Sequence, residues 1–321
     1  MTVQSSRHLV DPQLLGLLDS LPPLKLSDAI LPLVREGSRL PPRVVPEPTV
    51  PVFHEIRTVP GPAGSPDVAL YIYRPEAAAG PLPCILHVHG GGYVTGSPST
   101  QVAAHRSLAA ALSCCIVSVD YRLAPETRFP GAVEDCYAGL AWVTAHAAEL
   151  RVDPARIGVM GESAGGGLAA ALALLVRDRG ALRLSFQHLI YPMIDDRTCV
   201  SPDPHPFAGE FLWTPHNNHY GWKALLGGEP GSAGVSPYAA AARAERLEGL
   251  PPAFISTGSL DLFLEEDLDY ARRLLRAGVP VELHVYPGGF HAFDLDPDAA
   301  VARQARRDSR AALARALSAP D

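Results

Sequence analysis

The chain has no uninterrupted apolar segment of the roughly 18 residues that a membrane-spanning helix requires, so we expect no membrane span. It has no long block of basic or acidic residues, and its net charge of −7 disfavours nucleic acid or anionic membranes as partners. The first residues lack a charged segment followed by an apolar one, so we expect no secretory signal and a cytoplasmic location. The five cysteines form no CxxC pair, which favours reduced buried thiols. These absences leave a neutral or weakly charged small molecule as the expected substrate.

Short β-rich segments alternate with helical ones from residue 52 onward. The strand candidates are residues 52–59, 68–75, 84–89, 114–122, 156–162, 186–194, 252–258 and 281–288. The helix candidates among them are residues 100–112, 132–150, 164–179, 264–278 and 298–317. This alternation predicts an α/β fold with a mostly parallel sheet covered by helices on both faces.

Two segments break the alternation. Residues 1–50 contain proline-broken stretches that cannot form long regular elements, and we expect an N-terminal arm lying over the main body. Residues 196–240 insert far more chain between two strands than a crossover needs. We therefore predict a cap, built from the arm and this insert, over a core formed by residues 51–195 and 241–321.

The central motif is Gly161-Glu162-Ser163-Ala164-Gly165, placed after an apolar strand and before an Ala/Leu-rich helix. In this context the motif predicts a sharp strand-to-helix turn that projects the serine from a strained backbone. Glycines two residues before and after are needed because side chains there would collide. We therefore predict that Ser163 is a nucleophile, and we expect Glu162 to act as a bracing carboxylate.

A second motif, His-Gly-Gly-Gly-Tyr at residues 89–93, ends an earlier strand. Acyl transfer needs backbone N–H donors aimed at the oxyanion, and we assign Gly91, Gly92 and Ala164 to this oxyanion hole. A phosphate-binding loop would require a helix opening at once and a nearby lysine, and residues 93–96 offer neither. We expect His89 to brace the loop by hydrogen bonds.

The third signal is an acid and a histidine that each follow a late strand. Asp261 comes after the strand at 252–258, and His291 follows the last strand. The order serine, acid, histidine is the one expected of this type of sheet, where His291 accepts the serine proton and Asp261 orients the imidazole. Four competing acids fall inside the following helix and are disfavoured for that reason: Glu265, Glu266, Asp267 and Asp269.

In this order the motifs HGGGY, YRLAPE (residues 121–126), FPGAVED (129–135), GESAGG and GGFHAF resemble those of the bacterial hormone-sensitive lipase-like esterases. The stretch YPMIDDRT and the insert resemble the heroin-esterase-like branch most. The resemblance covers most of residues 84–293 and implies an eight-stranded α/β-hydrolase fold with a small helical cap, no cofactor, and a possible homodimer. One departure is visible, since this family usually has Asp-Pro-Leu-Arg where Asp261-Leu262-Phe263-Leu264 stands here.

Aromatic residues in the predicted cap and next to the motifs are candidates for binding the substrate. They are Tyr93, Phe211, Trp213, Tyr220 and Phe263. The cap also contains His205, His216 and His219, but no cysteine pair or matching acid completes a metal site, so we expect none.

Together these observations predict a serine-dependent carboxylesterase that hydrolyses small to medium acyl esters through an acyl-enzyme intermediate. Two alternatives stay open. The same residues could hydrolyse amides or lactones, or the scaffold could serve as a non-catalytic receptor for a small ligand.

Overall fold

Within the part of the chain that the structure describes, eight strands form one sheet in the order β1-β2-β4-β3-β5-β6-β7-β8. The structure is a computed structural model that describes residues 5–37, 45–77 and 80–318. Residues 1–4 and 38–44 of the predicted arm, and residues 78–79 and 319–321 of the predicted core, lie outside the described residues.

The strands lie close to their predicted positions. They are β1 (Val52–Val59), β2 (Val68–Pro75), β3 (Leu82–Val88), β4 (Cys115–Asp120), β5 (Val152–Glu162), β6 (Gln187–Ile190), β7 (Ala253–Gly258) and β8 (Val281–Tyr286). Strands β1, β2 and β4 pair antiparallel, and all pairings from β4 to β8 are parallel. Parallel pairing needs crossover connections, which the helices between the strands supply.

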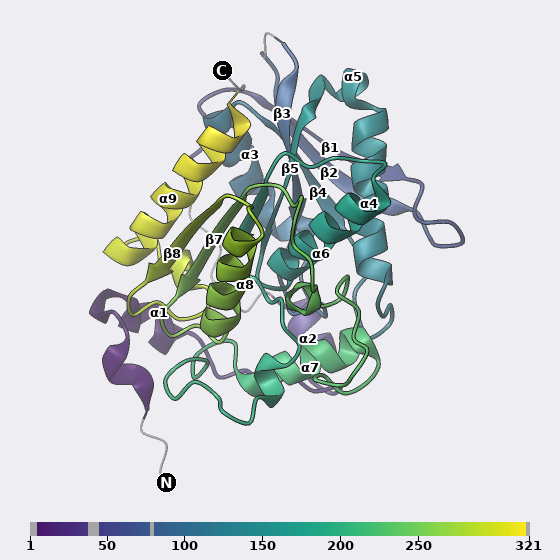
Figure 1. Cartoon of the computed structure of the whole chain (residues 1–321). Helices are drawn as coiled ribbons and strands as arrows, with labels where there is room; N and C mark the ends of the chain where they lie inside the picture. The colour runs from purple at the N-terminus through teal and green to yellow at the C-terminus, as the bar shows by residue number, and fades with distance from the viewer. Residues whose placement is uncertain (1–4, 38–44, 78–79, 319–321) are drawn as a thin grey trace.

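Helices cover both faces of the sheet, as Figure 1 shows. One face carries α3 (Val102–Leu112) and α9 (Ala300–Leu317), and the other carries α4 (Gly131–Ala145), α5 (Ala147–Leu150), α6 (Ala164–Arg179) and α8 (Leu264–Arg276). Successive strand residues point to opposite faces. Ile85 packs in the core under α3 and α9, whereas Leu86 packs in the core that contains α6. The predicted two-sided burial of the sheet is confirmed.

The remaining helices lie at one end of the sheet. They are α1 (Leu15–Ser20), α2 (Leu31–Glu36) and α7 (Pro215–Leu226), all in the predicted arm and insert. The two segments are joined directly, because the Asn217 side chain accepts a hydrogen bond from the Leu26 amide at 2.9 Å and donates one to the Leu24 carbonyl at 3.0 Å. Earlier in the insert, Glu210 accepts hydrogen bonds from Ser5 and Ser6. Residues almost 200 positions apart therefore form one layer.

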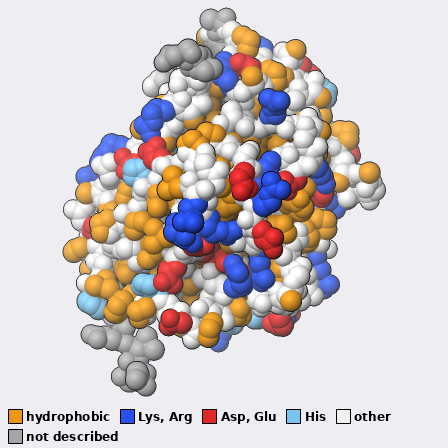
Figure 2. All heavy atoms as spheres, in the orientation of Figure 1, with side chains coloured by type: hydrophobic (Ala, Val, Ile, Leu, Met, Phe, Trp, Pro, Cys, Tyr) orange, Lys and Arg blue, Asp and Glu red, His pale blue; other side chains and the backbone are white. Residues whose placement is uncertain are grey.

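Basic and acidic side chains alternate over the face that Figure 2 shows, in keeping with the even spread of charge along the sequence. No helix in the described part of the chain is long and apolar enough to cross a membrane. All five cysteines are free thiols, of which four are buried and Cys199 is half-buried.

Candidate active site

Ser163 stands alone between the end of β5 at Glu162 and the start of α6 at Ala164. Its backbone has φ 55° and ψ −124°, a conformation that a residue with a side chain rarely adopts. The turn is so tight that a Cβ on Gly161 would lie 2.2 Å from the Gly165 carbonyl oxygen. A Cβ on Gly165 would lie 2.1 Å from the Val88 carbonyl oxygen. The two glycines of the motif are therefore required by close backbone contacts.

His291 lies between Ser163 and Asp261 at the carboxyl ends of three strands. Its Nε2 atom is 3.0 Å from the Ser163 hydroxyl oxygen, and its Nδ1 atom is 2.9 Å from an Asp261 carboxylate oxygen. All three side chains are buried, with Asp261 fully removed from solvent. A carboxylate at Nδ1 holds the proton on that nitrogen and leaves the Nε2 lone pair facing the serine hydroxyl.

The other acids of this region have different partners or face solvent. Glu266 is buried and accepts hydrogen bonds from the Ile194 and Asp195 amides, and burial raises its pKa well above the ordinary range. Burial likewise raises the pKa of Asp267, and the nearby Glu266 and Asp261 carboxylates add to this shift. Glu265 and Asp269 are exposed. Among the described residues, Asp261 is hydrogen-bonded to the His291 ring, and none of the four competing acids is.

The glycine loop at residues 90–92 lies against the serine. A Cβ on Gly90 would come within 2.9 Å of the Glu162 carbonyl oxygen and 3.5 Å of the Ser163 Cβ. Gly91 and Gly92 have φ values of 125° and 62°, which favour glycine. Among the described residues, the amides of Gly91, Gly92 and Ala164 donate no hydrogen bond. Three backbone donors are thus left available beside the hydroxyl.

Two histidines, His87 in β3 and His89 directly after this strand, support the region of the glycine loop and the serine by side-chain contacts. His89 is buried, its Nδ1 contacts the Gly90 carbonyl at 2.8 Å, and its ring stacks on Tyr121. Burial lowers the pKa of His89 to about 4, so the ring is neutral at pH 7. Glu162 contacts the His87 Nε2 atom at 3.0 Å. Both contacts match the bracing roles expected for His89 and Glu162.

A family model described as the alpha/beta hydrolase fold matches residues 85–295. Carboxylesterase NlhH of Mycobacterium tuberculosis is 35% identical over 98% of this chain and 98% of its own length. Esterase LipI of the same organism is 36% identical over 86% of this chain and 85% of its own length. The solved structure titled bacterial heroin esterase superposes with a TM-score of 0.88 at 38% identity, covering 98% of this chain and all of that one. The chain belongs to the hormone-sensitive lipase-like esterases of the α/β-hydrolase fold.

This esterase is a carboxylic ester hydrolase of the heroin-esterase-like branch. A second solved structure, of esterase LipW from Mycobacterium marinum, has a TM-score of 0.82 at 31% identity, and the match covers 99% of this chain and all of that one. Among the described residues of the esterase, no group of three or more His, Cys, Asp or Glu side chains is arranged to hold a metal ion.

Two of the predicted substrate contacts need correction. Tyr93 is buried, and its hydroxyl donates to the Met193 carbonyl at 2.7 Å while its ring packs on Trp222. Phe263 is fully buried and packs edge-on against His291 at a centroid distance of 5.2 Å. Both side chains therefore belong to the core that supports the site, because they have no surface that a substrate can reach.

The three candidates from the insert are partly exposed. The Trp213 ring lies so close to the glycine loop that a Cβ on Gly92 would sit 2.1 Å from its Cη2 atom, and its centroid is 6.3 Å from that of His291. Phe211 packs on Phe290, next to His291 in sequence. The Tyr220 hydroxyl donates to Asp28 of the arm at 2.8 Å, so its polar end joins the insert to the arm.

One residue beside the site is absent from the sequence-based predictions. Tyr191 directly follows β6, its ring packs edge-on against His291 at 4.8 Å, and its hydroxyl donates to Asp294 at 2.8 Å. The sequence pattern does indicate Tyr191, since a polar residue at the carboxyl end of a central parallel strand lies where catalytic groups gather.

Proposed function

We propose that this esterase hydrolyses esters with Ser163 as nucleophile, His291 as proton carrier and Asp261 as the residue that orients the imidazole. The observation that carries the proposal is the unbroken chain of two hydrogen bonds, of 2.9 and 3.0 Å, from the carboxylate through the ring to the hydroxyl. A serine hydroxyl is too weak an acid to attack an ester unaided, so a base within hydrogen-bond reach is needed.

In the first half-reaction, the Ser163 oxygen attacks the ester carbonyl while His291 Nε2 takes the hydroxyl proton. The carbonyl oxygen becomes an oxyanion, which accepts hydrogen bonds from the amides of Gly91, Gly92 and Ala164. The bond to the alcohol then breaks, and His291 gives its proton to the departing alkoxide. Ser163 is left as an acyl ester.

In the second half-reaction, His291 removes a proton from a water molecule as the water attacks the acyl ester. The same amides bind the new oxyanion, and the proton returns to the Ser163 oxygen as the carboxylic acid leaves. The buried Asp261 carboxylate stabilises the imidazolium that forms twice in each cycle.

We expect the acyl group of the substrate to be small to medium in size, because Trp213 restricts the space beside the oxyanion donors. Its indole touches Gly92, and its Nε1 atom is anchored to Asn218 on α7 at 3.2 Å.

Replacing Trp213 by alanine is expected to raise kcat/KM for a hexanoyl ester relative to an acetyl ester by roughly tenfold. The reason is that removal of the indole leaves space for the additional methylene groups of the longer acyl chain. A series of p-nitrophenyl esters of increasing acyl length measures this ratio. Trp142→Ala is the matched control, since Trp142 lies on α4, stacked on His146. An unchanged ratio in Trp213→Ala would show that this ring does not limit the acyl group.

An activated ester tests the assignment of the nucleophile. A p-nitrophenyl ester should give a burst of nitrophenol equal to the enzyme concentration, and a serine-directed organophosphate should label Ser163 and remove the burst. A receptor without catalytic activity gives no burst.

A matched anilide and a lactone, tested in parallel, separate ester hydrolysis from hydrolysis of amides or lactones. A faster reaction with the anilide than with the ester would contradict the ester preference. The homodimer and the cytoplasmic location stay predictions.

A further inference from the structure

Arg35 of α2 reaches the loop that contains the oxyanion donors, although it lies in the N-terminal arm, 59 residues before Val94. Its Nε atom donates to the Val94 carbonyl at 2.8 Å, and its Nη2 atom donates to the Ala124 carbonyl at 2.8 Å. It also forms an ion pair of 2.7 Å with the exposed Glu126 carboxylate. The arm therefore places a positive charge directly beside the glycine loop.

The Val94 carbonyl is one end of a hydrogen-bond chain that leads to Gly92. A peptide unit is planar and trans, so its N–H points away from its C=O. The Val94 carbonyl shares a peptide unit with the Thr95 amide, and this amide donates to the Gly91 carbonyl at 2.9 Å. The Gly91 carbonyl in turn shares a peptide unit with the Gly92 amide. Two hydrogen-bonded peptide units thus join the Arg35 guanidinium to the Gly92 N–H.

The other two oxyanion donors are also fixed through the carbonyls of their peptide units. The Gly90 carbonyl, which shares a unit with the Gly91 amide, lies 2.8 Å from the His89 Nδ1 atom. The Ser163 carbonyl, which shares a unit with the Ala164 amide, accepts from two backbone amides at 2.9 and 3.0 Å. Burial lowers the pKa of His89, so its ring is neutral at pH 7. These contacts orient the two donors without a full charge.

The chain to Gly92 ends on a full positive charge instead. An arginine keeps its charge in proteins, and the half-buried position of Arg35 reduces screening by solvent. A hydrogen bond from a charged donor is stronger than a neutral one, and hydrogen bonds in a chain polarise one another. The Gly92 N–H consequently binds a developing oxyanion more strongly than an isolated amide does.

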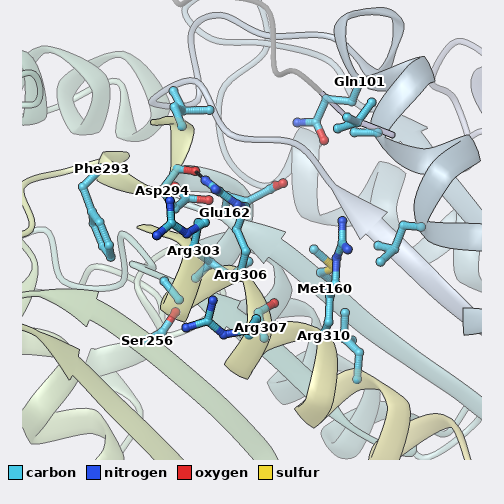
Figure 3. A pocket seen from close by; sticks show the side chains of 18 of the residues that line it. Gln101, Met160, Glu162, Ser256, Phe293, Asp294, Arg303, Arg306, Arg307 and Arg310 are labelled. Carbon is cyan, nitrogen blue, oxygen red and sulfur yellow. Dashed lines mark hydrogen bonds between the residues drawn. The ribbon is translucent and has the colours of Figure 1, made fainter. Parts of the chain in front are cut away.

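A second group of positive charges lies close to the end of β5 but does not reach this loop. Figure 3 shows arginines of α9 at a cavity of about 350 Å³ that Glu162 also lines. Among the described residues that line this cavity, none belongs to residues 90–95. The α9 arginines therefore lie outside the chain that leads to Gly92.

We propose that Arg35 is a positioning residue for ester hydrolysis, which orients and polarises the Gly92 amide through the two intervening peptide units. The proposal rests on the function proposed above, since an oxyanion forms only when a nucleophile attacks the ester carbonyl. The negative charge on the carbonyl oxygen develops in the transition state and is absent from the bound ester. Arg35 therefore acts on kcat and has little influence on KM.

Replacing Arg35 by alanine is expected to lower kcat for p-nitrophenyl acetate by roughly tenfold to 100-fold and to leave KM within about twofold. Arg35→Lys keeps the charge but lacks the planar fork that contacts two carbonyls, so it should recover part of the lost rate. Arg7→Ala is the matched control, because Arg7 is an arm arginine whose ion pair with Asp19 is exposed. Glu126→Gln removes the partner carboxylate and leaves both carbonyl contacts, so kcat should stay within about twofold.

Amide hydrogen exchange gives a readout that does not depend on turnover. It is measured in Ser163→Ala with and without Arg35→Ala, next to the melting temperature of each protein. The Thr95 amide should exchange faster by about tenfold without the arginine, because the peptide unit that carries this amide is no longer held at its carbonyl. Arg7→Ala in the same background should leave the exchange of this amide unchanged.

Four results would overturn the proposal. A kcat in Arg35→Ala within twofold of the parent shows that the oxyanion donors do not need the arginine, and a raised KM with unchanged kcat makes Arg35 part of ester binding. An equal loss of kcat in Glu126→Gln assigns the effect to the ion pair. Unchanged exchange of the Thr95 amide shows that the arginine does not hold the loop, whatever the nucleophile is.

The failure of the proposed function gives a different result. Ester hydrolysis retained in Ser163→Ala removes the nucleophile and this inference together. Hydrolysis lost in Ser163→Ala, combined with any of the four results above, removes the role of Arg35 alone.

Discussion

Replacing Ser163 by alanine is expected to lower kcat for a neutral ester by roughly 10⁵-fold to 10⁶-fold while the protein stays folded. The substitution removes the attacking oxygen, and the glycine loop that remains supports only weak hydrolysis by water. Among the residues that the structure describes, the Ser163 hydroxyl makes one side-chain hydrogen bond, to His291, so its loss leaves the packing of the strand-to-helix turn intact.

The measurement is the steady-state rate with a p-nitrophenyl ester, together with the melting temperature. Ser201→Ala, at an exposed position of the insert, is the matched control and should retain full activity. Ester hydrolysis at more than one hundredth of the parent rate in Ser163→Ala would rule out Ser163 as the nucleophile.

Replacing Asp261 by asparagine is expected to lower kcat by about 10⁴-fold. One Asp261 oxygen accepts from the Phe263 amide at 3.0 Å, and the other lies at His291 Nδ1. The asparagine carbonyl oxygen would keep the bond to the Phe263 amide, which turns the NH₂ group toward the ring. His291 would then accept at Nδ1 and carry its proton on Nε2, so it could not take the serine proton.

Glu265→Gln makes the same chemical change at an exposed acid four residues along and should leave kcat within twofold. Asp267 cannot replace the lost charge, because burial and the Glu266 carboxylate still raise its pKa once Asp261 is gone. A rate in Asp261→Asn within tenfold of the parent would contradict the orienting role.

The residues nearest the reaction were predictable because their geometry is local or follows from strand order. The motif around Ser163 dictates a turn that needs small neighbours, and the structure places backbone carbonyls where side chains at Gly161 and Gly165 would be. Asp261 and His291 each follow a strand of a parallel sheet, and the carboxyl ends of such strands meet at one edge. The structure brings both to hydrogen-bond distance in a single chain of contacts.

The aromatic residues were harder to predict. Tyr93 and Phe263 stand next to active-site motifs in the sequence, yet their side chains turn into the core, where Tyr93 meets Met193 and Phe263 supports His291. Trp213 lies about 120 residues from Gly92 and still touches it. Adjacency along the chain does not determine which way a side chain points, because packing against distant elements decides its rotamer.

Local sequence patterns are enough to predict the alternation of strands and helices, the strained turn at Ser163, the glycine loop and the positions of Asp261 and His291 after late strands, since periodicity and short motifs specify these features locally. Three-dimensional packing was needed to show how the arm joins the insert through Asn217, which aromatic ring covers Gly92, and that Tyr191 packs against His291. These features depend on contacts between segments far apart in the chain, and such contacts form when whole faces of helices and sheet pack together to bury apolar surface.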